Sequence, residues 1–292
     1  MTKILITGGT GLIGRHLTEK LIEKNYEVVI LTRNPKNKNE FKWDIDTGYI
    51  DENVFKNIDY GIHLAGAGIA DKRWTDKRKE EIIHSRVAST NLLFEKTKEH
   101  KVNLKGFISA SAIGFYGAKT TDTIFTETDK PADDFLGKVC QLWEEAIHQF
   151  KKENIRIVIL RTGIVLTKKG GALAKMKTPI ISPIGSGKQY MPWIHIDDLC
   201  TLYIASIENN LSGIYNAVAP EHQINTSFSK TLAKKIKRLY VPIGVPSFLL
   251  KLIFGEMANL LLKGSRVSSK KIEKSDFNFE FRTLTKALEN LV

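Results

Sequence analysis

The first 33 residues alternate between short apolar runs and a pattern with helical spacing. Lys3–Thr7 is apolar and β-branched, which is typical of a buried strand. Ile13, Leu17 and Leu21 then recur at intervals of four and so share one face of a helix. A second apolar run, Tyr26–Arg33, follows. The pattern predicts a strand–helix–strand unit at the start of the chain.

The same alternation continues to about residue 163. Three further apolar runs predict strands, and two stretches with helical character lie between them; they are Tyr60–Gly66, Leu104–Ser111 and Ile155–Gly163, with helices near Asp76–His100 and Phe135–Lys152. Strands that alternate with helices predict an α/β fold with a doubly wound, mostly parallel sheet.

The alternation ends after Gly163, where turn-rich segments begin. The most apolar later stretch is Val245–Leu262, which contains Lys251 and Glu256. Because a bilayer core penalises such charges, we predict one or two amphipathic helices there, with membrane association as the alternative. We expect a Rossmann domain at 1–165, to which 191–220 returns. Residues 166–190 and 221–292 should form a small α/β substrate lobe.

The turn after the first predicted strand carries three glycines. Gly8 allows a sharp turn, Gly11 lets a pyrophosphate approach the backbone, and Gly14 allows close helix–strand packing. The N-terminus of the following helix offers free N–H groups and partial positive charge to phosphates. The turn therefore predicts a dinucleotide site, and the residues expected to contact the cofactor are Gly8, Thr10, Gly11, Leu12, Ile13 and Gly14.

The end of the second strand decides between NAD and NADP. An NAD site usually has an acidic residue there, but this chain has Thr32 and Arg33, and no acid before Glu40. Arg33 could hold a 2′-phosphate through charge-assisted hydrogen bonds, Thr32 could add a hydroxyl, and Lys36 could add a second cation. We therefore predict NADP(H), with an ordinary exposed arginine at the strand end as the alternative.

Ligands of such sheets bind at the carboxyl ends of the strands. Four residues lie at or near the carboxyl ends of two predicted strands, so we expect them beside the cofactor; they are Leu64, Ala65, Gly66 and Ser109. Arg86 lies on the next helix and could meet a cofactor phosphate or an anionic substrate.

The composition indicates which classes of binding partner to expect. Lys and Arg number 44 against 32 Asp and Glu, a formal net charge of +12. The basic residues are spread in short groups, so we expect a solvated lysine-rich surface, and no zinc-finger, RRM or KH signature suggests nucleic-acid binding. The two cysteines, Cys140 and Cys200, form no CxxC and predict neither a metal site nor a disulfide framework.

No secretory h-region is visible in the sequence, since Ile4–Ile6 is too short. We therefore expect a cytoplasmic protein with a small-molecule substrate, no membrane partner, and a monomeric or homodimeric state.

Four motifs, TGGTGLIG, HLAGAG, SASAIGFYG and WIHIDDL, resemble the extended short-chain dehydrogenases/reductases of the nucleotide-sugar epimerase group. Five more segments resemble an atypical branch of that group, the cell-division-inhibitor-like "epimerase family"; they are ADKRWT, HSRVAST, CQLWEEA, RTGIVLTKKGGAL and LLLKGSRVSSKKI. The resemblance covers residues 1–292. It implies an N-terminal NADP(H)-binding Rossmann domain and a small C-terminal domain, but no known substrate.

The resemblance also implies a serine and a Tyr-x-x-x-Lys motif, from which this sequence departs. No tyrosine lies between Tyr116 and Tyr190. In DFLGKVCQLWEEA, one alignment puts Asp134 four residues before Lys138, and the other puts Leu136 and Cys140 at the tyrosine and lysine places. The serine place falls on Ala112, and Ser111 would point to the other face of its strand.

The catalytic residues are therefore unknown from the sequence, and Tyr116 and Lys138 are the candidate proton carriers. For Tyr116 we favour the alternative, a structural ring that lines the cleft. His195 belongs to a strand that leads into a helix, where we expect Asp197 and Asp198 to cap the N–H groups. The loop with Arg73 and Trp74 should project over the cleft and touch the substrate.

Two functions fit these residues. The first is an NADP(H)-dependent oxidoreductase or epimerase without the usual acid/base, in which hydride transfer takes place at nicotinamide C4 and the protein supplies orientation. The second is a redox sensor or regulatory protein that binds NADP(H) and changes its partner contacts without catalysis.

Overall fold

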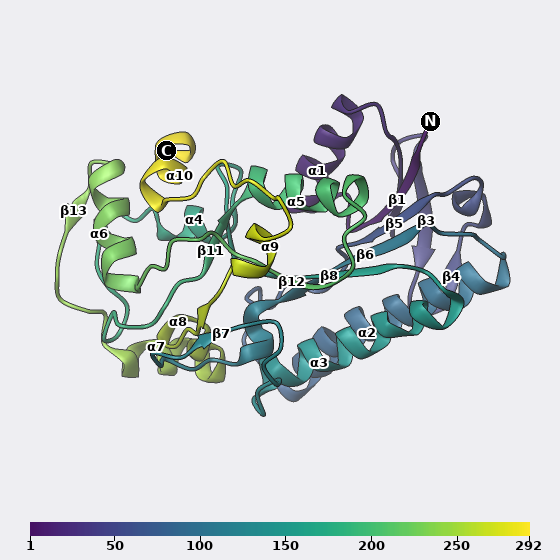
Figure 1. The fold of residues 1–292 in the computed structure, drawn as a ribbon. Helices are drawn as coiled ribbons and strands as arrows, with labels where there is room; N and C mark the ends of the chain where they lie inside the picture. The colour runs from purple at the N-terminus through teal and green to yellow at the C-terminus, as the bar shows by residue number, and fades with distance from the viewer.

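The computed structural model describes residues 1–292 and is built on one eight-stranded sheet (Figure 1). All strand pairs are parallel except the last, β3 with β4. The strand order is β12 (Gly213–Ala217), β8 (Ile157–Thr162), β6 (Gly106–Ala112), β5 (Tyr60–His63), β1 (Lys3–Thr7), β2 (Glu27–Thr32), β3 (Glu40–Asp44) and β4 (Tyr49–Ile50). The predicted doubly wound α/β fold is confirmed.

Helices cover both faces of the sheet. α1 (Leu12–Glu23) and α5 (Ile196–Glu208) lie side by side on one face, and α2 (Asp76–Glu99) and α3 (Phe135–His148) on the other. Successive side chains of β1 alternate between the two cores: Ile4 and Ile6 pack under α1 and α5, and Leu5 packs on the opposite side. This is the packing expected of a parallel sheet that is buried on both faces.

Some boundaries differ from the expectation. β3 and β4 were not predicted, because Glu40–Asp44 is largely polar and β4 has only two residues. The helix expected to reach Lys152 ends at His148, and a 3-10 turn, η3 (Gln149–Glu153), follows. β12 falls within the segment expected to return to the Rossmann domain, and it pairs with β8.

The later residues build smaller elements around a separate core that includes Trp193, Phe228, Leu232 and Leu284. The elements are β9 (Ile164–Leu166), α4 (Gly171–Met176), β10 (Ile180–Ile181), β11 (Trp193–His195), α6 (Asn225–Lys235), β13 (Leu239–Tyr240) and α10 (Leu284–Leu291). β7 (Ile124–Phe125) pairs with β14 (Arg266–Val267), which precedes α9 (Lys270–Glu273).

The apolar stretch Val245–Leu262 forms short helices: α7 (Ser247–Phe254), η4 (Gly255–Ala258) and α8 (Asn259–Leu262). The structure contains no helix with the length and apolar content needed to cross a membrane.

His63 ties the strand ends to α2. Its Nδ1 lies 2.7 Å from the Thr7 hydroxyl, and its Nε2 lies 3.2 Å from Ser89 Oγ and 3.1 Å from Thr90 Oγ1. Complete burial lowers the pKa of His63 to about 3, so the ring is neutral in the folded protein. The imidazole therefore joins β1, β5 and α2 by hydrogen bonds without a charge.

We predict that this histidine makes folding sensitive to acid. Burial lowers the pKa of His63 to about 3 and that of His195 to about 4, whereas the unfolded rings titrate at 6.5. Below 6.5 the unfolded state binds more protons, so the free energy of unfolding falls as the pH falls. Between about pH 7.5 and about pH 5.5, each ring should contribute a total loss of about 1.4 kcal/mol.

Urea unfolding between about pH 7.5 and about pH 5.5 checks this. His63→Gln should reduce the slope of stability against pH, whatever its effect on absolute stability. An unchanged slope in the variant would show that His63 is already protonated in the folded state.

Candidate functional site

The glycine turn between β1 and α1 is tightly packed on one side. Gly8 has φ +70°, and a Cβ there would lie 2.9 Å from the backbone of Leu64 and Ala65, at the end of β5. A Cβ on Gly14 would overlap the carbonyl oxygen of Gly8. Both glycines are therefore required for the backbone to approach this closely. At Gly11, by contrast, a Cβ would meet only the Gly8 oxygen, at 3.2 Å.

The N-terminus of α1 is open to a ligand. Gly11 is its N-cap with extended backbone, no side chain caps the helix, and the first turn carries no acidic residue. Thr10, Gly11 and Leu12 are exposed and Ile13 is partly buried. The first N–H groups and the positive end of the helix dipole therefore face solvent, which is the environment that binds phosphate groups.

The end of β2 presents a cation and no carboxylate. Arg33 is exposed and has no ion-pair partner, and Thr32 precedes it. Glu40, the first acid after Arg33 in the sequence, instead accepts hydrogen bonds from the Lys36 N–H at 2.6 Å and the Asn37 amide at 2.7 Å, and these bonds lower its pKa. This acid thus closes the loop between β2 and β3.

A further cation, Lys42, lies at the end of β2 and was not predicted from the sequence. β3 pairs with β2 in parallel, and the register sets Lys42 directly beside Thr32. The sequence analysis did not predict β3 as a strand, so it could not place Lys42 beside Thr32. Only the pairing of β3 with β2 shows this neighbour.

The turn after β5 lies beside the glycine turn. Leu64 and Ala65 are partly buried there, and Gly66 is exposed. Arg86 donates from one Nη to the carbonyl oxygens of Ala67 and Ile82, both at 3.0 Å, and no carboxylate pairs with it. Arg86 therefore supports the turn after β5 and brings an uncompensated positive charge to it.

Ser109, expected beside the cofactor, has its side chain in the protein core. Its side chain is fully buried and its hydroxyl donates to the Ala110 carbonyl at 3.0 Å. Along β6, Ala110 and Ala112 are partly exposed, and Ser111 is buried with its hydroxyl 2.7 Å from Glu144 Oε1. The alternation of a strand places both serines on one side of β6 and the two alanines on the other.

A buried ion pair lies behind the end of β6. The guanidinium of Arg161 binds both carboxylate oxygens of Glu144, at 2.9 and 2.8 Å, and its Cζ lies 3.3 Å from the centre of the Phe115 ring. Arg161 also donates to the Tyr116 hydroxyl at 3.0 Å, which in turn donates to Asn216 Oδ1 at 2.6 Å. Sequence patterns gave no signal for this network.

The position of Tyr116 fits the structural role that we favoured for it over a role as proton carrier. Its side chain is only 1% exposed, and burial raises its pKa to about 12. The hydroxyl is occupied by two partners inside the network, which agrees with the alternative structural role.

The chain is similar to known proteins over its whole length. A model described as the NAD dependent epimerase/dehydratase family matches residues 4–217, and a domain of unknown function matches residues 245–291. Epimerase family proteins of Staphylococcus aureus and Staphylococcus saprophyticus are each 36% identical over this whole chain and cover 99% and 100% of their own lengths. The chain belongs to the NAD dependent epimerase/dehydratase family. The resemblance predicted from the motifs is confirmed.

Solved structures of the epimerase group are similar over the full chain. The human epimerase family protein SDR39U1, determined with NADPH, has 30% identity and a TM-score of 0.90, with 99% of both chains covered. A nucleoside-diphosphate sugar epimerase of Corynebacterium glutamicum has 30% identity and a TM-score of 0.81, covering 99% of this chain and 58% of that one. UDP-N-acetylglucosamine 4-epimerase of Bacillus cereus, at 19% identity, shares the fold.

In this family member, Leu136 and Cys140 are the α3 residues that face the end of β6. A Cβ on Gly114, in the 3-10 turn η2 (Ile113–Tyr116), would lie 3.3 Å from Leu136 Cβ and 3.6 Å from Cys140 Sγ. The Cys140 thiol lies 3.5 Å from the Ala112 carbonyl, and burial raises its pKa to about 12. These residues form an apolar wall with Ala112, and no member of that wall carries a proton-transfer group that works near neutrality.

Lys138 points elsewhere, so the structure does not support it as a proton carrier. It is exposed on α3, whereas its neighbours Val139 and Cys140 are buried. Two residues of an α-helix turn through about 200°, which sets Lys138 opposite to Leu136. Asp134, the other residue of that alignment, caps α3 by accepting from the Gly137 N–H at 2.9 Å.

His195 is the N-cap of α5, which corrects the expected capping by the aspartates. Its Nδ1 accepts from the Asp197 N–H at 3.1 Å, and the ring has no exposed surface. Asp197 pairs instead with Lys20 and His16, both at 2.7 Å, and Asp198 accepts from backbone N–H groups at residues 280 and 281.

The loop after β5 packs more closely than expected. Trp74 is 8% exposed, donates to the Ile69 carbonyl at 2.8 Å and shares a small core with Met257 of η4. Arg73 is exposed and contacts Gly255. The loop therefore joins the Rossmann domain to η4, and Trp74 acts there as a core residue.

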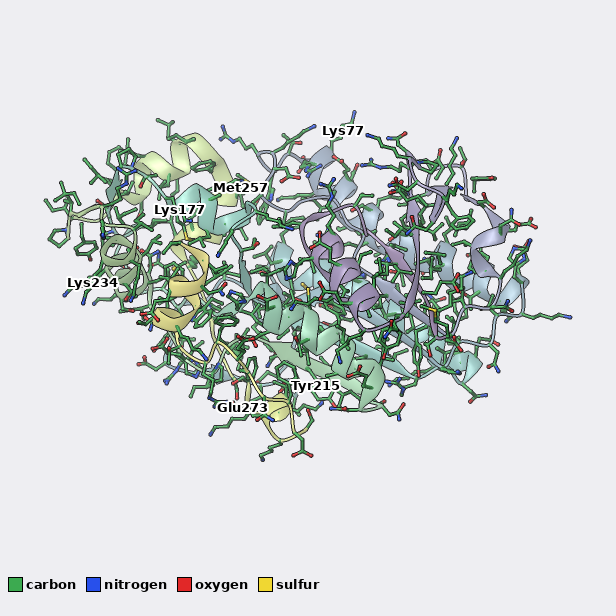
Figure 2. The ribbon with its side chains drawn as sticks, turned by 90° about the horizontal axis from the view of Figure 1, so that it is seen from above. Lys77, Lys177, Tyr215, Lys234, Met257 and Glu273 are labelled. Carbon is green, nitrogen blue, oxygen red and sulfur yellow. The ribbon has the colours of Figure 1, made fainter.

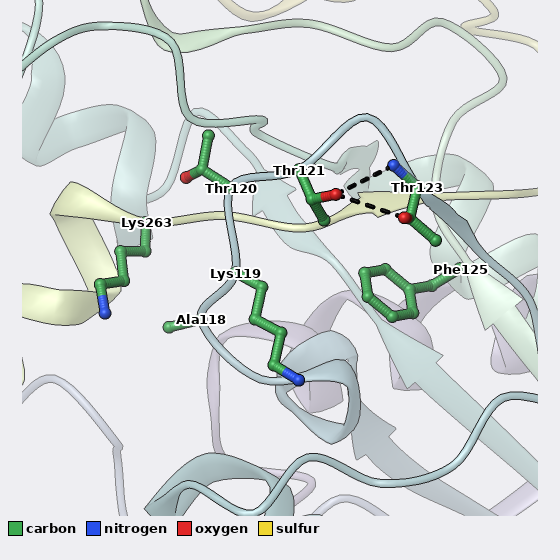
Figure 3. Close-up of a pocket in the computed structure, with 7 residues that line it drawn as sticks. All are labelled: Ala118, Lys119, Thr120, Thr121, Thr123, Phe125 and Lys263. Atoms are coloured by element: carbon green, nitrogen blue, oxygen red, sulfur yellow. Dashed lines mark hydrogen bonds between the residues drawn. The ribbon is translucent and has the colours of Figure 1, made fainter.

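An open cavity of about 650 Å³ lies beside the loop that follows η2 (Figure 3). It is lined by Ala118, Lys119, Thr120, Thr121, Thr123, Phe125 and Lys263. None of these residues was a candidate from the sequence.

We predict that Gly11→Val abolishes dinucleotide binding without unfolding the protein. Gly11 is exposed and its Cβ position is free except for one oxygen, so the fold tolerates a side chain that would fill the phosphate site. NADPH fluorescence titration measures binding, and circular dichroism with thermal melting measures folding. Retained binding in a folded variant would place the phosphates elsewhere.

Proposed function

We propose that the protein is an NADP(H)-dependent oxidoreductase of the epimerase family that works without the usual tyrosine acid/base. The observation that carries the proposal is the open phosphate site next to an unpaired cation: α1 has an uncapped N-terminus, and Arg33 has no acidic partner. The NADPH in the structure of human SDR39U1 supports the same cofactor.

The residues of this groove fit the dinucleotide. The first turn of α1 would hold the pyrophosphate through the N–H groups of Leu12 and Ile13, because the Gly11 N–H already donates to the Gly8 carbonyl at 3.0 Å. Arg33, with Thr32 and Lys42 beside it, would hold a 2′-phosphate. A carboxylate that would instead bind the ribose 2′-hydroxyl is missing, since Glu40 is used by its own loop.

The bound dinucleotide would supply hydride exchange at its nicotinamide ring. The chain's own contribution at the substrate is an apolar wall of Ala112, Leu136 and Cys140, which excludes water from one side of the site. Because this wall donates no proton, the proton of the reaction comes from solvent or from the substrate. We propose a small molecule as the substrate.

A second candidate is an NADP(H)-binding sensor without catalysis, which the same apolar wall favours. Tight binding of NADPH together with no turnover on any substrate would select the sensor. The proposal also includes a cytoplasmic location, supported by two free, buried cysteines, and a monomeric or homodimeric state.

We predict a preference for NADP(H) over NAD(H) that depends on Arg33. Loss of a charge-assisted contact to phosphate costs about 1.5–3 kcal/mol, so Arg33→Ala should weaken NADPH binding roughly tenfold or more and leave NADH binding unchanged. Fluorescence titration of both cofactors measures this. Lys56→Ala, an exposed lysine on another loop, is the control. Equal affinity of the unmodified protein for NADPH and NADH contradicts the proposal.

We predict that Tyr116→Phe and Lys138→Met leave turnover within about twofold of the unmodified enzyme, because neither side chain acts as the proton carrier. The assay follows NADPH oxidation with a panel of ketones, quinones and nucleotide sugars. Nucleotide sugars should react very weakly, since a positioned acid/base contributes about 10²–10⁴-fold. A hundredfold loss in either variant, or rapid turnover of a nucleotide sugar, would refute this mechanism.

A further inference from the structure

The outer face of α7 is apolar and exposed to solvent. Phe248 is 67% exposed, Leu252 73% and Ile253 61%, and Leu249 and the preceding Ile243 are also exposed. These five are among only thirteen large hydrophobic residues exposed in the whole chain, and all fall within eleven positions. A contiguous apolar surface of this kind marks an interaction site. We refer to these five residues as the α7 face.

The opposite side of α7 is already used for packing. Leu250 is buried, and Phe254 packs against the small core of Trp74, Ile82, Val139 and Met257. This packing fixes the orientation of the helix and leaves Phe248, Leu249, Leu252 and Ile253 outward. Figure 1 shows α7 and α8 at the margin of the molecule, away from the central sheet.

The charge of the protein is concentrated on the same part of the structure. Residues 166–190 and 221–292, which we call the C-terminal lobe, carry 18 Lys and Arg against six Asp and Glu. The remaining residues carry 26 of each, so the whole net charge of +12 belongs to the lobe. From His222 to Gly255 there are six basic residues and no acid. Lys177 and Lys234 mark this end of the molecule in Figure 2.

Several of these cations surround the α7 face. Lys251 lies on α7, and Lys263 follows α8 and shares the cavity of Figure 3 with Lys119. Lys188 lies in the loop whose Gly185 abuts Ser247 and Leu262. None of the four lysines forms an ion pair. Two acids lie in adjoining segments: Glu256 on η4 is paired with Lys79, and Asp122 belongs to the loop that carries Lys119.

We propose that the α7 face and its surrounding lysines dock the protein on the surface of an anionic lipid bilayer. An apolar helix face within a basic surface is the combination that binds at the interface of such membranes, with the side chains inserted among the acyl chains and the lysines at the headgroups. The helix lies on the surface and does not span it. This departs from the expectation of no membrane partner.

Two other occupants fit the observations less well. A second copy would bring one strongly basic lobe against another, so Lys251 and its neighbours would repel their equivalents. A nucleic acid would satisfy the lysines but would leave Phe248 and Leu252 without an apolar partner. An anionic bilayer offers acyl chains to the apolar α7 face and negative headgroups to the surrounding lysines.

Co-sedimentation of the full chain with vesicles tests the proposal. Vesicles of phosphatidylcholine with phosphatidylglycerol are compared with vesicles of phosphatidylcholine alone, at low and high salt. The apolar variant is Phe248→Ser with Leu252→Ser, and its control is Ile22→Ser, an exposed apolar residue on α1. The charge variant is Lys251→Glu with Lys263→Glu, and its control is Lys56→Glu with Lys152→Glu. All substituted side chains are exposed, and thermal melting confirms that each variant is folded.

The unmodified protein should bind only the anionic vesicles, and salt should weaken the binding. Each lysine near such a surface raises the affinity for anionic vesicles about fivefold, so the charge variant should bind them at least tenfold more weakly. The apolar variant should also bind at least tenfold more weakly, and both controls should stay within about twofold of the unmodified protein. Failure of the folded protein to bind anionic vesicles would overturn the proposal, as would equal losses in the controls. A dimer that the apolar variant dissociates, seen by sedimentation velocity, would assign the face to a second copy instead.

Discussion

A buried positive charge at the carboxyl ends of the central strands constrains much of this structure. Arg161 is 2% exposed, and such a charge is tolerated only when it is paired and hydrogen-bonded. Glu144 of α3 supplies the paired carboxylate, so α3 is fixed against β6 and β8. Tyr116 and Asn216 complete the network and join η2 to β12. Removal of either charge would leave its partner uncompensated inside the protein.

The network also determines what the site offers to a substrate. Tyr116 is held inside the network, and α3 is oriented so that Leu136 and Cys140 face η2 while Lys138 faces solvent. The phosphate site at α1 is independent of this arrangement, because it depends on glycine packing and on an open helix N-terminus. An open helix N-terminus therefore coexists with an apolar wall of Ala112, Leu136 and Cys140, and this combination underlies the proposed oxidoreductase.

The sequence was informative where short-range geometry decides the structure. The glycines at 8, 11 and 14 predicted the turn because their spacing requires close backbone approach, and the alternation of β6 predicted that Ser111 faces away from the groove. The burial of Ser109 and Trp74 and the exposure of Lys138 could not be predicted, because they depend on packing between distant elements. The concentration of positive charge in the C-terminal lobe was also not predicted, because the lobe is assembled from two separate segments and its lysines are scattered along the chain.

We propose that the site between α1 and the end of β2 selects a dinucleotide with a 2′-phosphate. Native mass spectrometry of the cofactor-free chain with equal concentrations of NAD⁺, NADH, NADP⁺ and NADPH tests it most directly. The account predicts one bound dinucleotide per chain, with the mass of NADP⁺ or NADPH. A complex with the mass of NAD⁺ or NADH, or equal amounts of both kinds, would contradict it.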